Sequence, residues 1–291
     1  MRYQRIILAA ALCTLPLSYA QASPQDDTDH CNNIHMGDWD KTVVRAEEDL
    51  TVPNSGSPLK VIAQRNGGVS VRGSDTGNFK VHVCKVAAAD TKAEADRLLS
   101  QIKVQASGST LQPSGPEGGD WTAFIMIEAP RTASVEAETT NGPLSFRDMQ
   151  GSLTATAKNG PVSFKNVSGS VTANVQNGPV SYRGNSGDIK LTSHNGPLDL
   201  RLDGENWNGG GLRAETTNGP LSLSLPDSFH SGVEINTDGH APISCRMKGC
   251  ESVQRVSENG QRRISLGSGA PVVRISTHNG PVMIGNSQAE Y

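Results

Sequence analysis

The sequence predicts an all-β fold, a right-handed parallel β-solenoid with coils of about 18 residues and one short helix near the N-terminal end. Three observations lead to this prediction. The tripeptide Asn-Gly-Pro recurs at a constant step, and the segments between its copies alternate apolar with polar residues. Aromatic residues make up only 4% of the chain, which holds 31 glycines, and this composition suits a thin core repeated along an axis.

The repeated corner begins with an asparagine, and six copies share it: Asn141, Asn159, Asn177, Asn195, Asn218 and Asn279. The first four are 18 residues apart, and "TDGHAPIS" at 237–244 is a degenerate copy. Asparagine and glycine tolerate left-handed backbone angles, and proline suits the start of a strand. Stacked asparagine side chains can hydrogen-bond to one another. The six asparagines are therefore expected to be structural corners.

The segments on either side of a corner are expected to be strands. Leu144 and Phe146 point to one face, and Leu153, Ala155 and Ala157 form a matching apolar face. A single unit cannot bury such a face, but stacked units can, with equivalent residues about 4.8 Å apart. An antiparallel meander would also alternate, but its hairpins would place identical corners at opposite ends. The constant repeat therefore favours parallel stacking.

The N-terminus has the features of a cleaved signal peptide over residues 1–22. Arg2 and Arg5 precede a short apolar run, and "AQA" at 20–22 is a small-x-small cleavage site. The run is too short to span a bilayer. We therefore expect an exported protein, located in the periplasm or at the cell surface, with an irregular segment at 23–45.

Two further regions follow from the pattern. Residues 46–135 are expected to form divergent N-terminal coils with a helix at 91–103, where Thr91 and Glu94 match a capping box. The stretch at 107–120 is expected to be a Gly/Pro/Ser loop. Residues 136–287 contain the regular Asn-Gly-Pro repeats.

The net charge limits which classes of binding partner the protein can attract. The chain has 26 Lys and Arg against 29 Asp and Glu, and loss of Arg2 and Arg5 leaves 24 against 29, a net charge of −5. This balance gives no general attraction to nucleic acid. No second long apolar stretch is present, so we expect no membrane span in the mature chain.

Four cysteines remain after cleavage: Cys31, Cys84, Cys245 and Cys250. An even number in an exported chain suggests two disulfides, for which three pairings exist. Cys245 and Cys250 enclose only "RMKG", so we expect them to pair, which leaves Cys31 for Cys84. A metal site is the alternative, but no Cys-x-x-Cys occurs and no histidine has ligand-like spacing. We expect neither metal nor cofactor.

Several motifs together resemble a known family. "NGGVSVRG", a helix ending in "LLSQIKV", "IEAP" before the first regular repeat, and "TTNGPLSF" resemble the bacterial putative-adhesin family, a domain of unknown function, over residues 45–287. The resemblance implies a right-handed β-solenoid and attachment at the cell envelope. It supplies no functional residues. This chain has Asn-Gly-Pro where many relatives have Asn-Gly-Gly or Asn-Gly-Asp.

The sequence contains no Gly-x-Ser-x-Gly, His-Glu-x-x-His or phosphate loop, so we expect no enzyme and no catalytic residue. A carbohydrate-active enzyme remains the alternative. In "LDLRLD", Asp199 and Asp203 share an outward face with Arg201 and could work as an acid–base pair on a glycosidic bond. A solvated, self-neutralising face explains the same residues.

One set of residues suggests binding. Each of the first four corner asparagines is followed six residues later by a cation: Arg147, Lys165, Arg183 and Arg201. Stacking would align these cations in a column that matches an anionic envelope polymer, with Ser145, Ser163 and Ser181 alongside as hydrogen-bond donors. The alternatives are a solvated face with Asp148 and Asp188 as counter-charges, and a scaffold that presents its surface to a protein partner.

Overall fold

The computed structural model describes Cys31, Ile34 and residues 40–238, 241–248, 250, 254–258 and 261–287. The chain divides into two compact units, Met1–His35 and Met36–Tyr291. Only Cys31 and Ile34 of the first unit are described, so the account below concerns the second unit. The expected signal peptide, residues 1–22, lies outside the described residues.

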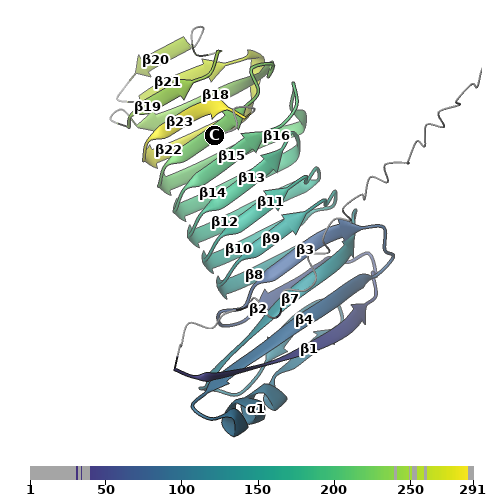
Figure 1. The fold of residues 1–291 in the computed structure, drawn as a ribbon. Helices are drawn as coiled ribbons and strands as arrows, with labels where there is room; N and C mark the ends of the chain where they lie inside the picture. Colours follow the sequence, from purple (N-terminus) through teal and green to yellow (C-terminus); the bar gives the residue numbers. More distant parts are fainter. Residues whose placement is uncertain are drawn as a thin grey trace, which may run out of the picture. The chain divides into compact units, whose positions relative to one another are not determined.

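The first sheet has 11 strands and mixes parallel with antiparallel pairs (Figure 1). In spatial order its strands are β1 (Thr42–Val52), β4 (Phe79–Ala89), β7 (Asp120–Pro130), β3 (Val69–Ser74), β9 (Leu144–Arg147), β11 (Val162–Lys165), β13 (Val180–Gly184), β15 (Leu198–Leu202), β17 (Leu221–Leu225), β23 (Val282–Asn286) and β19 (Ile243–Arg246).

The second sheet has 12 strands and is also mixed. In spatial order its strands are β20 (Gln254–Glu258), β21 (Gln261–Leu266), β18 (Ser231–Asp238), β22 (Ser268–Asn279), β16 (Asn208–Asn218), β14 (Ser186–Asn195), β12 (Ser170–Asn177), β10 (Leu153–Asn159), β8 (Val135–Asn141), β2 (Leu59–Ala63), β6 (Thr110–Ser114) and β5 (Lys103–Ser107).

The predicted fold class, a right-handed parallel β-solenoid, is wrong. The structure is all-β with one helix among its described residues, but its two large sheets combine parallel and antiparallel strands. β1, β4 and β7 pair antiparallel, and so do β18, β21 and β20. The physical reason lies in the sequence outside the repeats. The long strands β1, β4 and β7 lack Asn-Gly-Pro corners, so no shared corner fixes their direction.

Between the repeats themselves the pairing is parallel and in register. β8, β10, β12 and β14 lie side by side with equivalent residues opposite each other, so that Ala155 faces Ala137 and Ala173 (Figure 1). On the other sheet Phe164 lies between Phe146 and Tyr182. The step of 18 residues thus sets the register of both sheets in this part of the chain.

The order of the last repeats in space differs from their order in the chain. β22 and β23, which flank Asn279, lie between the strands of the Asn218 copy and those of the degenerate copy, β18 and β19. The antiparallel hairpin β20–β21 then pairs with the outer side of β18. The chain therefore passes the degenerate copy before it completes the regular series.

At the other end, β2 and β3 extend the regular part across a long gap in sequence. β2 pairs in parallel with β8, and β3 with β9. The intervening chain forms β4, the helix α1 (Lys92–Gln101) and β5 to β7. The Thr91 side chain accepts a hydrogen bond from the Glu94 N–H and caps α1.

The stretch at 107–120, expected to be a loop, contains β6. Leu111 and Pro113 are buried on one face of this strand, which pairs antiparallel with β5. Helix α1 packs its Ala95 and Leu98, together with the C-cap residue Ile102, into a small cluster with Trp121. The expected domain boundaries stay predictions, and β1 begins at Thr42, inside the segment expected to be irregular.

One apolar core joins the inward faces of both sheets. Its aliphatic side chains alternate with outward polar residues along the strands, as the burial of Leu198, Leu200 and Leu202 in β15 shows. The rings of Phe146 and Phe164 stack with centroids 5.2 Å apart. The repeat therefore stacks core residues as well as corners.

Cys245 and Cys250 form a disulfide. The expected pairing of Cys31 with Cys84 stays a prediction. Of the helices in the part of the chain that the structure describes, none has the length and apolar character needed to cross a membrane.

Candidate functional site

The corners form a hydrogen-bonded asparagine ladder. Each Nδ2 donates to the Oδ1 of the preceding asparagine, at 2.7 Å for Asn159 to Asn141 and 2.9 Å for Asn177 to Asn159. The ladder begins with Asn66, whose Asn-Gly lies in the region expected to form divergent coils but is not among the six predicted corners. Its full membership is Asn66, Asn141, Asn159, Asn177, Asn195, Asn218 and Asn279.

The glycine of each corner stands against the backbone of the neighbouring corner. A Cβ on Gly160 would lie 2.2 Å from the carbonyl oxygen of Gly142, and one on Gly196 would lie 2.0 Å from that of Gly178. Such distances exclude any larger residue without movement of the backbone. The Gly160 N–H donates to the Asn177 carbonyl at 2.9 Å, so the close approach also forms a hydrogen bond. Asn-Gly is thus a packing requirement.

The predicted cations do lie in one row, and the row is longer than expected. Arg147, Lys165, Arg183 and Arg201 stand opposite one another on β9, β11, β13 and β15. Arg72 on β3 faces Arg147 and adds a fifth cation, which follows Asn66 by the same six residues. We call these five residues the basic column. It ends where Ser224 faces Arg201.

Counter-charge is uneven along the basic column. Asp203 accepts from Arg183 Nε at 3.1 Å and lies 3.9 Å from Arg201 Nε. Lys165 has no ion-pair partner among the described residues. Neighbouring cations one strand apart repel by roughly 1 kcal/mol in water. The column is therefore neutralised at the Asp203 end, and positive charge persists around Lys165.

One counter-charge expected from the sequence, Asp188, belongs to β14, in the other sheet. The Asp148 carboxylate accepts a hydrogen bond from Asn166 Nδ2 at 3.1 Å. Asp203, which the sequence suggested as a catalytic acid, is instead the ion-pair partner of the column.

The serines Ser145, Ser163 and Ser181 stand opposite one another beside the basic column. Ser163 Oγ donates to Ser145 Oγ at 3.2 Å. All three side chains are half-buried. They form a narrow row of hydroxyls next to the cations, with Asp199 facing Ser181 at its end.

The carboxylates of Asp199 and Asp203 are not brought together. Four residues along an extended segment correspond to about 13 Å of backbone. Acid–base pairs of glycosidases stand about 5–9.5 Å apart. Asp203 is also held by Arg183 and Arg201. This geometry does not favour the alternative of a carbohydrate-active enzyme.

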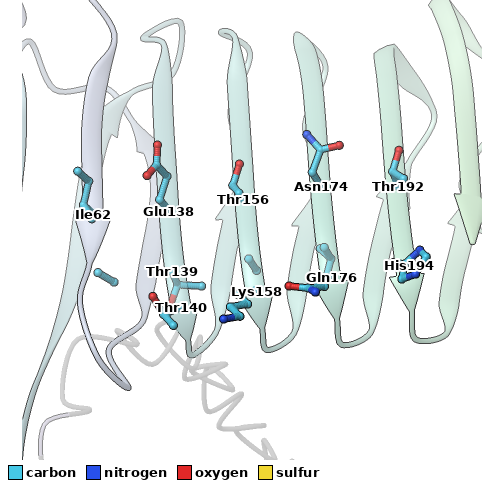
Figure 2. A pocket seen from close by; sticks show the side chains of 13 residues that line it. Ile62, Glu138, Thr139, Thr140, Thr156, Lys158, Asn174, Gln176, Thr192 and His194 are labelled. Carbon is cyan, nitrogen blue, oxygen red and sulfur yellow. The ribbon is translucent and has the colours of Figure 1, made fainter.

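A groove on the outer face of the second sheet is a further candidate that the sequence did not reveal. It has a volume of about 510 Å³ and crosses β8, β10, β12 and β14 near the asparagine corners. Two rows of side chains line it, as Figure 2 shows. One row consists of Glu138, Thr156, Asn174 and Thr192, and the other of Thr140, Lys158, Gln176 and His194.

The middle of the groove offers hydroxyl and amide groups beside one cation, Lys158. Thr156, Asn174 and Gln176 in its middle are exposed and uncharged. Glu138 is paired with Lys60 at 3.0 Å, and this hydrogen bond raises the pKa of Lys60. Because the rows follow the strand register, equivalent groups recur about every 4.8 Å along the groove.

His278 is held at its corner between two carboxylates. Its Nδ1 lies 3.1 Å from Asp238 Oδ2, and its Nε2 lies 3.7 Å from Glu215 Oε1. The hydrogen bond with Asp238, and to a lesser degree the charge of Glu215, raises the pKa of His278 above 6.5. The site stabilises an imidazolium at the surface.

The chain matches no protein-family model and no curated protein. Solved structures that the chain matches include a putative cell adhesion protein from Clostridium sporogenes, with 15% identity, 84% of this chain and 100% of that chain covered, and a TM-score of 0.35. A putative adhesin from Bacteroides fragilis has 13% identity, with 84% and 97% covered and a TM-score of 0.45. A putative adhesin from Parabacteroides distasonis has 12% identity, with 83% and 97% covered and a TM-score of 0.44. These neighbours have the names of adhesion proteins and not of enzymes. The Cys245–Cys250 disulfide is compatible with an exported protein.

Proposed function

We propose that this protein is an exported, adhesin-like binding module of the cell envelope, and that its basic column holds an anionic polymer. The observation that supports the proposal is the alignment of five cations on consecutive strands. An anionic chain laid along the column would meet a cation about every 4.8 Å. Each contact is weak, and repetition supplies avidity.

The uneven distribution of carboxylates along the basic column also supports the binding of an anionic polymer. Aligned like charges oppose one another, and an external anion relieves that repulsion where no carboxylate does so. Lys165 is such a position. Ser145, Ser163 and Ser181 lie beside the cations and can donate hydrogen bonds to phosphate or carboxylate oxygens.

Co-sedimentation with isolated envelope polymers across a salt series tests the proposal. The test variant replaces Arg147, Lys165, Arg183 and Arg201 with Gln. The control variant replaces four exposed cations elsewhere, Arg97, Lys103, Arg246 and Lys248, and has the same net charge. The parent and the control should sediment at low salt and be released at high salt, and the test variant should stay in solution. Equal sedimentation of both variants would show that the basic column does not bind the polymer, and a protein partner would then be the better explanation.

The groove supports a second candidate function, the binding of an uncharged glycan chain. Its rows of hydroxyl and amide groups recur at the strand spacing. A sugar unit of an extended glycan advances by close to this spacing. An extended peptide advances only about 3.3 Å per residue and falls out of step with the rows. A glycan can therefore repeat its hydrogen bonds along the groove where a peptide cannot.

A further inference from the structure

A second group of cations lies on the outer face of the other sheet. Lys190 on β14 faces Arg213 on β16, which faces Arg274 on β22. All three side chains are exposed. We call these residues the cationic triad. Each of them precedes a corner asparagine, Asn195, Asn218 or Asn279, by five residues.

The fold brings the triad together without neutralising it. In the described parts of the chain, no carboxylate forms an ion pair with Lys190, Arg213 or Arg274. Asp188 lies in the same depression, and Glu234 on β18 stands opposite Arg274 but forms its ion pair with Arg263. The arrangement contrasts with Arg183 and Arg201, which share Asp203. Three like charges on adjacent strands are unfavourable unless an anion joins them.

The triad surrounds a depression and not a flat face. The depression has a volume of about 310 Å³, within the range of small-ligand sites. A bulge between β14 and β16 opens one side of it, where Gly210 and Gly211 also line it. Gly211 has a φ of 129°, and a Cβ on it would lie 2.7 Å from the Val272 carbonyl oxygen. The glycines therefore preserve the bulge and leave space beside the cations.

We propose that the cationic triad is a binding site for a diphosphate group, free or carried on a larger molecule. Two guanidinium groups and one ammonium group are suited to phosphate oxygens, since Arg binds them in bidentate fashion. The triad extends over two strand spacings, about 10 Å, which exceeds the reach of a single phosphate. A carboxylate ligand would leave one or more of the three cations unmatched.

Titration calorimetry of the purified chain with pyrophosphate tests the site. A second titration with adenosine diphosphate tests a diphosphate that is attached to a larger molecule. The parent should bind pyrophosphate, and orthophosphate should bind at least tenfold more weakly. Equal affinity for pyrophosphate and adenosine diphosphate means that the group alone is recognised, and tighter binding of the nucleotide means that a carrier adds contacts. Absence of binding of both at millimolar concentration would overturn the proposal.

The variants separate this site from a general effect of charge. Arg213→Gln with Arg274→Gln should weaken pyrophosphate binding at least tenfold, whereas the matched pair Arg97→Gln with Arg246→Gln, two exposed arginines outside both the triad and the basic column, should leave it unchanged. Equal losses in the two pairs would show only a general effect of charge and refute the site. Circular dichroism of each variant establishes that it is folded. Because the triad shares no residue with the basic column, this proposal and the proposed function can fail separately.

Discussion

Asn159 Nδ2 donates a 2.7 Å hydrogen bond to Asn141 Oδ1, across exactly one repeat of 18 residues. The same contact recurs at each corner of the regular series. A side-chain ladder of this kind fixes register, because a slip by one residue would break every contact and turn the apolar faces outward.

Replacement of Asn177 by Ala should lower the free energy of unfolding by about 1 kcal/mol. Asn177 donates to Asn159 and accepts from Asn195, both at 2.9 Å, so the change removes two exposed hydrogen bonds. Urea unfolding measures the effect. Gln176→Ala, at the adjacent exposed position outside the ladder, is the matched control and should leave the midpoint almost unchanged. The same midpoint for both variants would mean that the ladder contributes no stability.

Gly196→Ala should destabilise the protein more, by about 2–4 kcal/mol. Gly196 has no left-handed φ, so the cost arises from overlap of the new Cβ with the Gly178 carbonyl oxygen at 2.0 Å. Gly77→Ala is the control, since nothing lies within 4 Å of a Cβ there. Thermal and urea unfolding should both separate the two variants. A small effect at Gly196 would mean that the corner backbone can move apart.

The pairing of strands within the repeat could be predicted from the sequence, but the pairing of strands outside the repeat could not. Asn-Gly-Pro at a constant step predicted which residues face one another, and Lys165 does face Arg147 and Arg183. The fold class was wrong because β1, β4 and β7 lack corners, and their antiparallel pairing depends on contacts between distant segments. Such pairing leaves no periodic signal in one sequence.

The candidate sites were likewise predicted only in part from the sequence. The four repeated cations were predicted, whereas Arg72 was missed because Asn66, six residues before it, begins an Asn-Gly-Gly and was not counted among the six Asn-Gly-Pro corners. The cationic triad and the groove also follow the repeat, since their residues stand at fixed distances before the corner asparagines. Only the place of Arg274 beside Arg213 could not be predicted, because β22 lies next to β16 ahead of the degenerate copy.

His278 should make stability depend on pH. Asp238 and Glu215 raise its pKa in the folded protein above 6.5. The stabilisation is therefore fully present below the unfolded-state pKa and disappears as the pH rises through the folded-state pKa. Unfolding midpoints measured from about pH 5 to about pH 8 should fall less steeply in His278→Gln than in the parent.

His194→Gln is the matched control for this prediction. His194 also precedes an Asn-Gly corner, but among the described residues it forms no ion pair. Its replacement should leave the pH profile as in the parent. If both variants retain the parent profile, the carboxylates around His278 do not contribute to stability.

The groove leads to a prediction about ligand length. Affinity for β-1,4-linked gluco- and chito-oligosaccharides should rise from disaccharide to tetrasaccharide and then level off, because the groove crosses a limited number of strands. Thr156→Val with Asn174→Leu retains the shape of the side chains and removes their hydrogen bonds. This pair should weaken tetrasaccharide binding about tenfold. Thr154→Val with Thr172→Val is the matched control, because these threonines face each other on the same two strands outside the groove. Binding that is independent of length, or that weakens equally in both pairs, would exclude a glycan chain from the groove.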